Sequence, residues 1–264
     1  MTRTRDVDTE TGKPIWRLLE TGHADAFHNM ALDEAILEAG RDGRVRPTLR
    51  LYGWSPPAVS IGYFQRLDEE VHTQTCEDLG IDVVRRITGG GAVLHDKEVT
   101  YSVIASETDD SIPRGMLESY KLICAGIIEG LRSLGIEAGL SGNDIVVGSE
   151  KVSGNAQNRR WGAILQHGSI FLDADYETMF SVLNVAKEQM NRGNTCMVRG
   201  RMTSLRELSG KGPDFRTVSS HLAKGFEKAL GIEFSSAEPA KEETERAESL
   251  ARTKYSTPEW NGRR

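Results

Sequence analysis

Three consecutive glycines at residues 89–91 follow the end of a predicted strand, and they constrain the fold more than any other feature of this sequence. Glycine adopts backbone conformations that a Cβ would forbid, and it lets a ligand approach the main chain closely. Successive free N–H groups in such a turn can hold an anion. The run lacks both the Gly-Lys-Ser/Thr ending of a P-loop and the GxGxxG spacing of a dinucleotide-binding turn, so both motifs are excluded. A tight turn between two strands is the simpler interpretation of the same glycines.

Two adjacent arginines, Arg85 and Arg86, end the strand that precedes the glycines. Side chains alternate between the two faces of a strand, so one of the pair should lie on the ligand side of the turn. A guanidinium beside free N–H groups suits a phosphate or a carboxylate. The alternative is an ordinary sheet edge whose arginines form surface ion pairs.

A second candidate region surrounds Lys151, which opens a predicted strand after a turn at 148–150. The small residues Gly154 and Ala156 follow it, so a long cationic side chain could reach into a cavity; a solvated lysine is the alternative. Asp144 could bind a hydrated Mg²⁺ at a nucleotide phosphate, although one carboxylate is weak evidence for a metal site. His167, in another β-rich run, is expected to form hydrogen bonds at the pocket.

Hydrophobic periodicity predicts a chain of alternating strands and helices. Strands are expected near 15–19, 49–54, 59–64, 81–86, 99–104, 144–147, 163–165 and 169–172. Helices are expected near 29–39, 67–79, 116–134, 176–183 and 215–230. This pattern indicates one α+β domain over residues 1–234, with a mixed sheet flanked by helices. Residues 235–264 are polar, and we expect them to form a tail or a surface helix without a full accessory domain.

Composition limits the classes of partner. The 264-residue chain has a formal net charge of −6, so no overall excess of Lys and Arg favours nucleic acid or an anionic membrane. The polar N-terminus lacks the apolar core of a signal peptide, and no run approaches the ~18 apolar residues of a membrane span. The three cysteines form no CxxC pair, which argues against a disulfide framework. We therefore expect a soluble, cytoplasmic protein.

Four ordered motifs resemble lipoate-protein ligase A, in the group that includes biotin-protein ligases and octanoyl transferases. They are RRITGGGAVLHD at 85–96, SGNDIVV at 141–147, EKVSGNAQ at 150–157 and LQHGSIFLD at 165–173. Weaker agreement runs from MALDE at 30–34 and SIGYFQ at 60–65 to KYSTPEW at 254–260. The resemblance covers most of the chain, and it implies the class II synthetase-like fold of the biotin-protein ligases.

The resemblance also implies an ATP-dependent lipoate-protein ligase. Such an enzyme forms the acyl-adenylate lipoyl-AMP from lipoate and ATP, and then transfers lipoyl to a lysine of a GcvH-like or E2-like carrier domain. Ligases that activate lipoate unaided carry a further C-terminal domain, so a separate accessory ligase subunit is expected here. The acyl chain would need an apolar slot, which residues near Tyr63, Val83 and Val93 could provide.

Each implied site residue is assigned from its place in a motif. Lys151 would be catalytic and would bridge the acyl carbonyl and the phosphate, Asp144 would hold Mg²⁺, and His167 would line the pocket. The adenylate would be contacted by Arg86, Gly90, Gly91, Ala92, Val93, Leu94 and His95.

Two other hypotheses remain open. The run KEVTYSV at 97–103 resembles cysteine-dependent octanoyl transferases, which would move octanoyl or lipoyl between carriers through a thioester. Residues 135–150, where one related transferase group has its cysteine, contain none; Cys196 remains as a substitute, unless it is an unreactive thiol. The third hypothesis is a non-catalytic module that binds an adenylate or a carrier.

Overall fold

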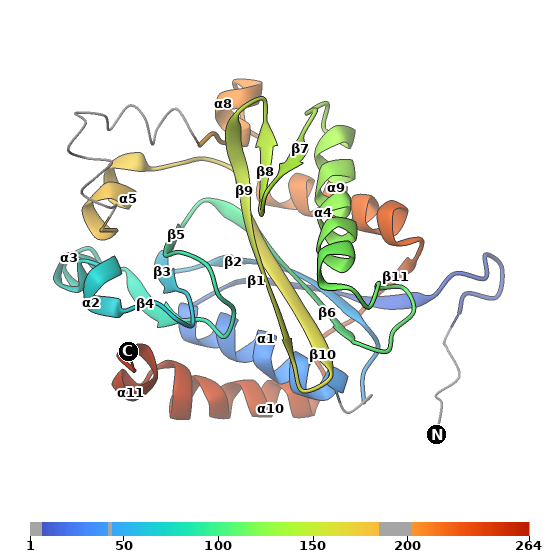
Figure 1. Ribbon diagram of the computed structural model, residues 1–264, viewed down its shortest axis with the longest axis horizontal. Coiled ribbons are helices and arrows are strands. Elements are labelled where there is room, and N and C mark those ends of the chain that lie inside the picture. Colours follow the sequence, from blue (N-terminus) through green and yellow to red (C-terminus); the bar gives the residue numbers. More distant parts are fainter. Residues whose placement is uncertain (1–6, 42–43, 185–201, 264) are drawn as a thin grey trace.

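An eight-stranded mixed sheet runs through the molecule (Figure 1), in the order β11-β1-β2-β6-β10-β9-β8-β7. The computed structural model describes residues 7–41, 44–184 and 202–263. Strand β1 is parallel to both of its neighbours, and the pairs from β2 to β7 are antiparallel. The strands are β1 (Ile15–Ala24), β2 (Thr48–Trp54), β6 (Glu98–Ser106), β7 (Gly139–Ser141), β8 (Asp144–Val147), β9 (Glu150–Arg160), β10 (Ala163–Phe171) and β11 (Glu233–Ser236).

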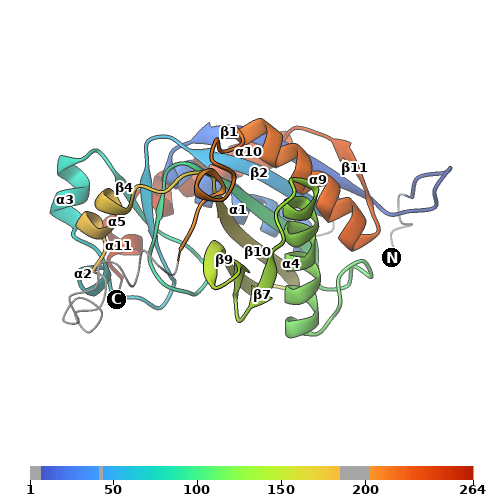
Figure 2. The same cartoon turned by 90° about the horizontal axis from the view of Figure 1, so that it is seen from above.

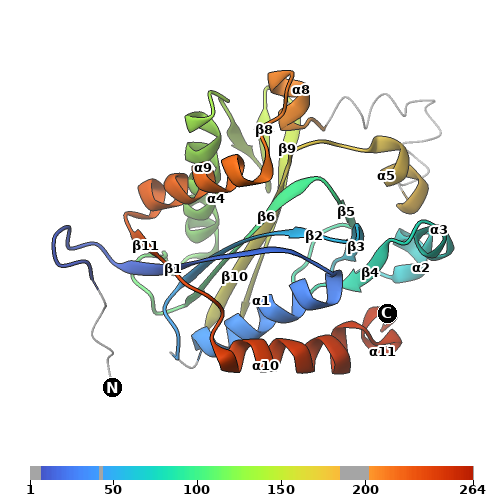
Figure 3. The ribbon, with the colours of Figure 1, turned by 180° about the vertical axis from the view of Figure 1, so that it is seen from behind.

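Helices cover both faces of this sheet, as Figures 2 and 3 show. Helices α4 (Met116–Ser133) and α9 (Phe215–Leu230) pack on one face, and α1 (Ala26–Arg41) and α10 (Lys241–Leu250) on the other. Glycines let α4 and α9 approach closely, because a Cβ at Gly225 would lie 2.3 Å from the carbonyl oxygen of Gly126. The predicted α+β class, with a mixed sheet between helices, is confirmed. No helix in the described ranges is long and apolar enough to cross a bilayer.

A small three-stranded sheet, in the order β4-β3-β5, lies beside the large one. Its strands are β3 (Ala58–Ile61), β4 (Asp82–Arg85) and β5 (Val93–His95), and the short helices α2 (Leu67–Glu70), α3 (Thr73–Asp78) and α5 (Tyr176–Val182) lie near it. The single helix predicted at 67–79 is wrong: the buried Val71, with extended backbone, separates α2 from α3.

The strand predicted at 59–64 ends earlier than expected, at Ile61. Gly62 follows, and a Cβ there would lie 2.1 Å from the carbonyl oxygen of Gly90. The backbone therefore leaves the strand to pack against the glycine turn. The amide of Tyr63 then donates to the carbonyl of Thr88 over 2.8 Å, which fastens the two loops together.

Odd-numbered and even-numbered side chains on the central strands lie on opposite faces of the large sheet. On β2 and β6, the odd-numbered residues from Leu49 to Leu51 and from Val99 to Val103 join the core beneath α4 and α9. The intervening side chains are largely polar and lie on the opposite face. Sheet register aligns them in two rows, because Tyr52 pairs with Thr100 and Thr100 with Ser169, while Arg50 pairs with Ser102 and Ser102 with His167. These buried polar rows set the position of the site.

The C-terminal segment packs against helix α1, on the face of the large sheet that carries the polar rows. After α8 (Leu205–Ser209), α9 and β11, the chain forms α10, the π-helix η1 (Ala251–Tyr255) and α11 (Pro258–Asn261). Glu243 of α10 accepts two hydrogen bonds from the buried Arg17, and Lys254 and Tyr255 both bond Glu34 of α1. The division at residue 234 stays a prediction, although residues 235–263 contact the domain at many points.

Candidate active site

A cavity of about 270 Å³ lies between the polar rows of the large sheet and the glycine turn. Most of the site residues predicted from the motifs line it: Arg86, Gly90, Gly91, Val93, His95, Asp144, Lys151 and His167. Ala92 and Leu94 differ, because their side chains pack on the apolar cluster of the small sheet. The roles assigned to these residues stay predictions, but the structure brings eight of the ten to one cavity.

Arg86 shapes the glycine turn. Its guanidinium donates to the carbonyls of Gly89 and Gly91 and to both oxygens of Ser60, over 2.7–3.2 Å. Burial lowers the pKa of Arg86 to about 10, which leaves the group charged at neutral pH. Gly90 has φ +94°, and a Cβ there would lie 2.9 Å from Arg86 Nη2. The turn therefore needs glycine at this position for both conformation and space.

Its neighbour Arg85 points elsewhere, as strand alternation requires. Arg85 is fully buried and donates to the carbonyls of Gly62, Gln65 and Asn261. It therefore fastens the end of β4 to the C-terminal helix α11, while Arg86 contacts the cavity.

Lys151 and Asp144 form an ion pair of 2.8 Å at the rim of the cavity. A Cβ at Gly154 would lie 2.8 Å from Lys151 Nζ, so glycine leaves room for the lysine to lie across the strand. The Asp144 carboxylate is thus engaged by an ammonium group. Among the described residues, no group of three or more His, Cys, Asp or Glu is placed to hold a metal ion. The expected role of Asp144 in holding Mg²⁺ stays a prediction.

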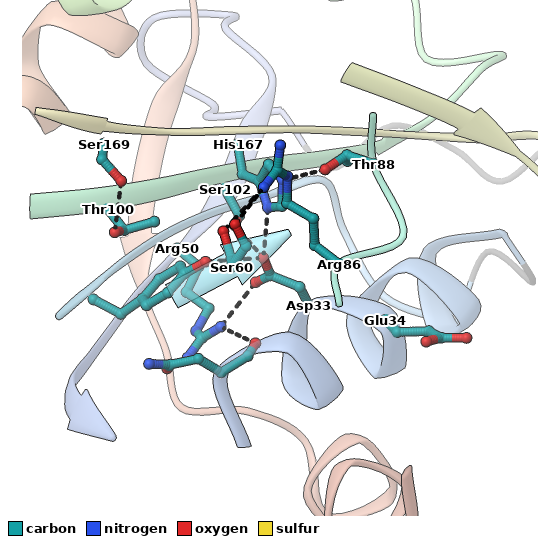
Figure 4. A network of polar contacts seen from close by, with 12 residues as sticks. Asp33, Glu34, Arg50, Ser60, Arg86, Thr88, Thr100, Ser102, His167 and Ser169 are labelled. Carbon is teal, nitrogen blue, oxygen red and sulfur yellow. Dashed lines mark hydrogen bonds and ion pairs between the residues drawn. The ribbon is translucent and has the colours of Figure 1, made fainter. Parts of the chain in front are cut away.

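His167 belongs to a buried network that Figure 4 shows. Its Nε2 lies 2.6 Å from Thr88 Oγ1, and its Nδ1 lies 3.4 Å from Asp33 Oδ2. Asp33 also accepts hydrogen bonds from Arg50 and Ser102. Burial lowers the pKa of His167, so the neutral ring is favoured. Burial alone would raise the pKa of Asp33, but the bonds from His167 and the Arg50 charge outweigh it and lower that pKa.

A second network surrounds His95. Its Nδ1 lies 2.6 Å from Glu98 Oε1, and its Nε2 lies 2.7 Å from Ser60 Oγ. The indole of Trp54 stacks on the imidazole, with ring centroids 4.1 Å apart and an interplanar angle of 13°. Ser169 donates to Glu98 over 2.6 Å.

Sequence reasoning missed several residues of the site. Of the three residues expected to form the apolar slot, Val93 lines the cavity, whereas its other apolar walls come from Met30, Tyr52, Trp54 and Phe171. The polar residues Asp33, Arg50, Ser60 and Glu98 were not singled out either. For Arg50, Ser60 and Glu98, the available signal was a polar side chain within an otherwise apolar strand, which is unusual for a buried sheet. Asp33 lies on helix α1, where that signal does not apply.

The two cysteines in the described ranges are both buried. Cys76 packs in the cluster of the small sheet and Cys124 in the main core. Burial raises the pKa of Cys76, and it raises that of Cys124 to about 12, so both thiols are disfavoured as thiolates. Cys196 lies outside the described residues.

Comparisons with known proteins show the family to which the chain belongs. Residues 25–227 match the lipoyl protein ligase A/B catalytic domain. The octanoyltransferase LipM of Kyrpidia tusciae is 43% identical, over 94% of this chain and 99% of that protein.

Solved structures agree on the fold. A bi-partite lipoate protein ligase from Thermoplasma acidophilum, described with its E2 lipoyl domain, is 31% identical with a TM-score of 0.83, over 93% of this chain and 95% of that one. A lipoate-protein ligase A bound with ATP is 30% identical with a TM-score of 0.81, over 93% and 98% of the two chains.

These relatives correct the predicted activity. ATP-dependent formation of lipoyl-AMP was expected, but the relatives that are 35% to 43% identical over nearly the whole chain are octanoyltransferases. The prediction was wrong because the roles expected of Arg86 and Lys151, beside an acyl carbonyl and its leaving group, would suit AMP and a thiol alike. They do not distinguish the two.

The glycine turn, the cavity with Lys151 at its rim, and the match over most of the chain lead to one conclusion. The chain is a member of the lipoyl protein ligase A/B catalytic domain family.

Proposed function

We propose that this protein is an octanoyltransferase, which moves an octanoyl group from a thioester on one carrier to a lysine of a lipoyl domain. The observation that supports this most is the likeness to LipM octanoyltransferases along nearly the whole chain. The cavity suits a short acyl chain, because its volume of about 270 Å³ lies just below the ~300–1,000 Å³ usual for small-molecule sites.

Lys151 is the residue to which we assign stabilisation of the carbonyl. Attack on a thioester builds negative charge on the carbonyl oxygen, and a fixed ammonium group beside it lowers the barrier. Asp144 holds this ammonium at the cavity rim. A donor of this kind contributes on the order of 3 kcal/mol. A thioester is already activated, so the proposed reaction needs no ATP.

The acceptor is proposed to be an E2-type lipoyl domain. The Thermoplasma acidophilum relative is described with its E2 lipoyl domain, and its fold matches this chain with a TM-score of 0.83. The lysine amine attacks the acyl carbon, an amide forms, and the bond to sulfur breaks.

We assign the intermediate thioester to Cys196. Cys76 and Cys124 are buried, and their raised thiol pKa values oppose ionisation. The acyl group would pass from the donor thiol to Cys196, releasing the donor as a free thiol, and then to the acceptor lysine, restoring Cys196.

The test uses an octanoyl-thioester carrier as donor, an apo lipoyl domain as acceptor and no nucleotide. We expect octanoylation of the acceptor lysine, and, without acceptor, an octanoyl adduct that peptide mass spectrometry maps to Cys196. Cys196→Ser should lose both, whereas the control Cys124→Ser keeps both. Absence of transfer by the wild type would refute the proposed octanoyltransferase activity. Transfer that is present in the wild type and persists in Cys196→Ser would refute only the proposed thioester intermediate on Cys196.

A further inference from the structure

The ion pair between Lys151 and Asp144 is too exposed to fix the lysine by itself. The two side chains are 30% and 40% exposed, and an ion pair open to water is weak because solvent screens it and both side chains are flexible. Stabilising a carbonyl nevertheless requires an ammonium group that is already in place when negative charge develops. The backbone that carries this pair must therefore be held by other contacts.

A β-bulge in β9 aims Lys151 at the cavity. Asp144 pairs with Gly154, but the register then shifts so that Val146 pairs with Lys151, and Val152 becomes the extra residue. Val152 joins the core beneath α4, whereas Lys151 lines the cavity together with Asp144 and Gly154. In a regular strand, alternation would place Lys151 and Gly154 on opposite faces. The direction of the lysine thus depends on how β8 and β9 are joined at this point.

A tyrosine on the opposite face of the sheet reaches the backbone beside this bulge. Helix α4 packs near β7 (Figure 1), and its Tyr120 is 8% exposed. The Tyr120 hydroxyl lies 2.8 Å from the carbonyl oxygen of Asn143 and 3.2 Å from that of Asn155. Burial raises the pKa of Tyr120, so the hydroxyl keeps its proton and donates it to these carbonyls. Asn143 directly precedes Asp144, and Asn155 directly follows its strand partner, so the hydroxyl joins the two strands where Asp144 is placed.

The side chain of Asn155 supports the same junction. Its Nδ2 donates to the carbonyl of Asn143 over 3.2 Å, and its Oδ1 accepts from the hydroxyl of Tyr101 over 2.9 Å. Gln166 in turn donates to the Tyr101 hydroxyl over 3.1 Å. Hydrogen bonds therefore connect the buried interior of the sheet to the turn that precedes Asp144.

We propose that Tyr120 is a positioning residue for the acyl transfer: it holds the backbone at Asp144, and through Asp144 it fixes the ammonium group of Lys151 beside the acyl carbonyl. This inference rests on the proposed octanoyl transfer. Tyr120 does not line the cavity, so it acts only through the residues that it holds. Its hydroxyl should therefore affect kcat and leave KM for the acyl donor unchanged.

The first test is Tyr120→Phe, which removes the hydroxyl and keeps the ring in the core. With the octanoyl-thioester carrier and the apo lipoyl domain, we expect kcat to fall about fivefold, the factor that one net hydrogen bond is worth, at unchanged KM. The matched control is Ser119→Ala on the same helix, because the Ser119 hydroxyl accepts from Gln157 and Arg159, further along β9. Its kcat should equal that of the wild type. An unchanged kcat in Tyr120→Phe, or an equal fall in both variants, would overturn the positioning role.

A second measurement needs no enzymatic activity. Brief treatment with an amine-acetylating reagent, followed by peptide mass spectrometry, gives the labelling rate of Lys151 relative to the exposed Lys241. An amine released from Asp144 loses its proton more readily and reaches the reagent more easily. We expect this ratio to rise about fivefold in Tyr120→Phe and to stay at the wild-type value in Ser119→Ala. A wild-type ratio in Tyr120→Phe would overturn the positioning role, whatever the kinetics show.

The two measurements separate this inference from the proposed function. If the wild type transfers no octanoyl group, the proposed function fails, whereas the labelling ratio still decides whether Tyr120 holds Lys151. If Tyr120→Phe does not fold, Tyr101→Phe takes its place, since it removes the donor to Asn155. It should shift kcat and the labelling ratio in the same directions by smaller factors, and wild-type values of both in the folded variant would overturn the inference.

Discussion

At the scale of single residues, some residues of the site could be found from sequence motifs, and others only from the contacts in the folded structure. Arg86 and Lys151 stand in motifs, so their place at the cavity could be predicted from the sequence. Asp33 and Glu98 could not, because a buried carboxylate depends on partners that are remote in sequence. Asp33 pairs with Arg50, 17 residues away, and Glu98 accepts from Ser169, 71 residues away. Hydrophobic periodicity indicates which face of a helix or strand is buried, but not which buried side chains contact one another.

The buried His167 gives the folded protein a pH dependence. In the folded state, burial lowers the pKa of His167 below its usual value of 6.5. The unfolded chain therefore binds the proton more readily. The free energy of unfolding should therefore fall as pH drops below about 6.5, by at most about 1.4 kcal/mol per pH unit from this residue. We expect His167→Gln to show a smaller slope between pH 6.5 and 5 in urea unfolding.

His221→Ala serves as the control for that slope, since His221 lies between α4 and α9, away from the cavity. Burial also lowers the pKa of His28, so His28 contributes to the pH dependence of the unfolding free energy in the wild type and in both variants. Equal slopes in the wild type and His167→Gln would show that His167 does not contribute.

At the scale of elements, the C-terminal helix α11 positions the strand that leads into the glycine turn. Trp260 Nε1 donates to the carbonyl of Arg85 over 2.8 Å, and the amide of Arg85 donates to Asn261 Oδ1 over 2.8 Å. The polar composition of residues 235–264 predicted a tail or a surface helix. Composition could not show this contact, because η1 and α11 bind through a few specific groups that are remote in sequence from their partners: Lys254 and Tyr255 bond Glu34, and Trp260 and Asn261 bond the backbone of Arg85. Hydrophobic periodicity likewise missed the break at Val71.

Removing the indole tests this role of α11. Trp260→Ala should lower the free energy of unfolding by about 2–3 kcal/mol, from lost packing and one lost hydrogen bond. It should also reduce kcat/KM for octanoyl transfer, because Arg86 follows Arg85 directly. Trp161→Ala is the matched control, since Trp161 is 41% exposed at the tip between β9 and β10. Equal kcat/KM in the two folded variants would show that α11 does not position Arg86 for the reaction.

At the scale of the whole molecule, fold and family could be predicted from ordered motifs, but the activity could not. The sheet, its flanking helices and the cavity follow from periodicity and from the glycine turn, and relatives of this fold include both ligases and octanoyltransferases. Both activities require an acyl carbonyl beside a cation. The difference lies in the leaving group, for which the motifs around Arg86 and Lys151 carry no signal.

The most direct measurement is therefore a comparison of donors. The purified chain and an apo E2-type lipoyl domain are incubated with an octanoyl-thioester carrier without nucleotide, or with lipoate, ATP and Mg²⁺, and the acceptor mass is followed over time. Lys151→Ala and the exposed-lysine control Lys121→Ala are run beside the wild type. The account predicts rapid octanoylation from the thioester, its loss in Lys151→Ala alone, and no comparable modification from lipoate and ATP. Modification from lipoate and ATP, with none from the thioester, would contradict it.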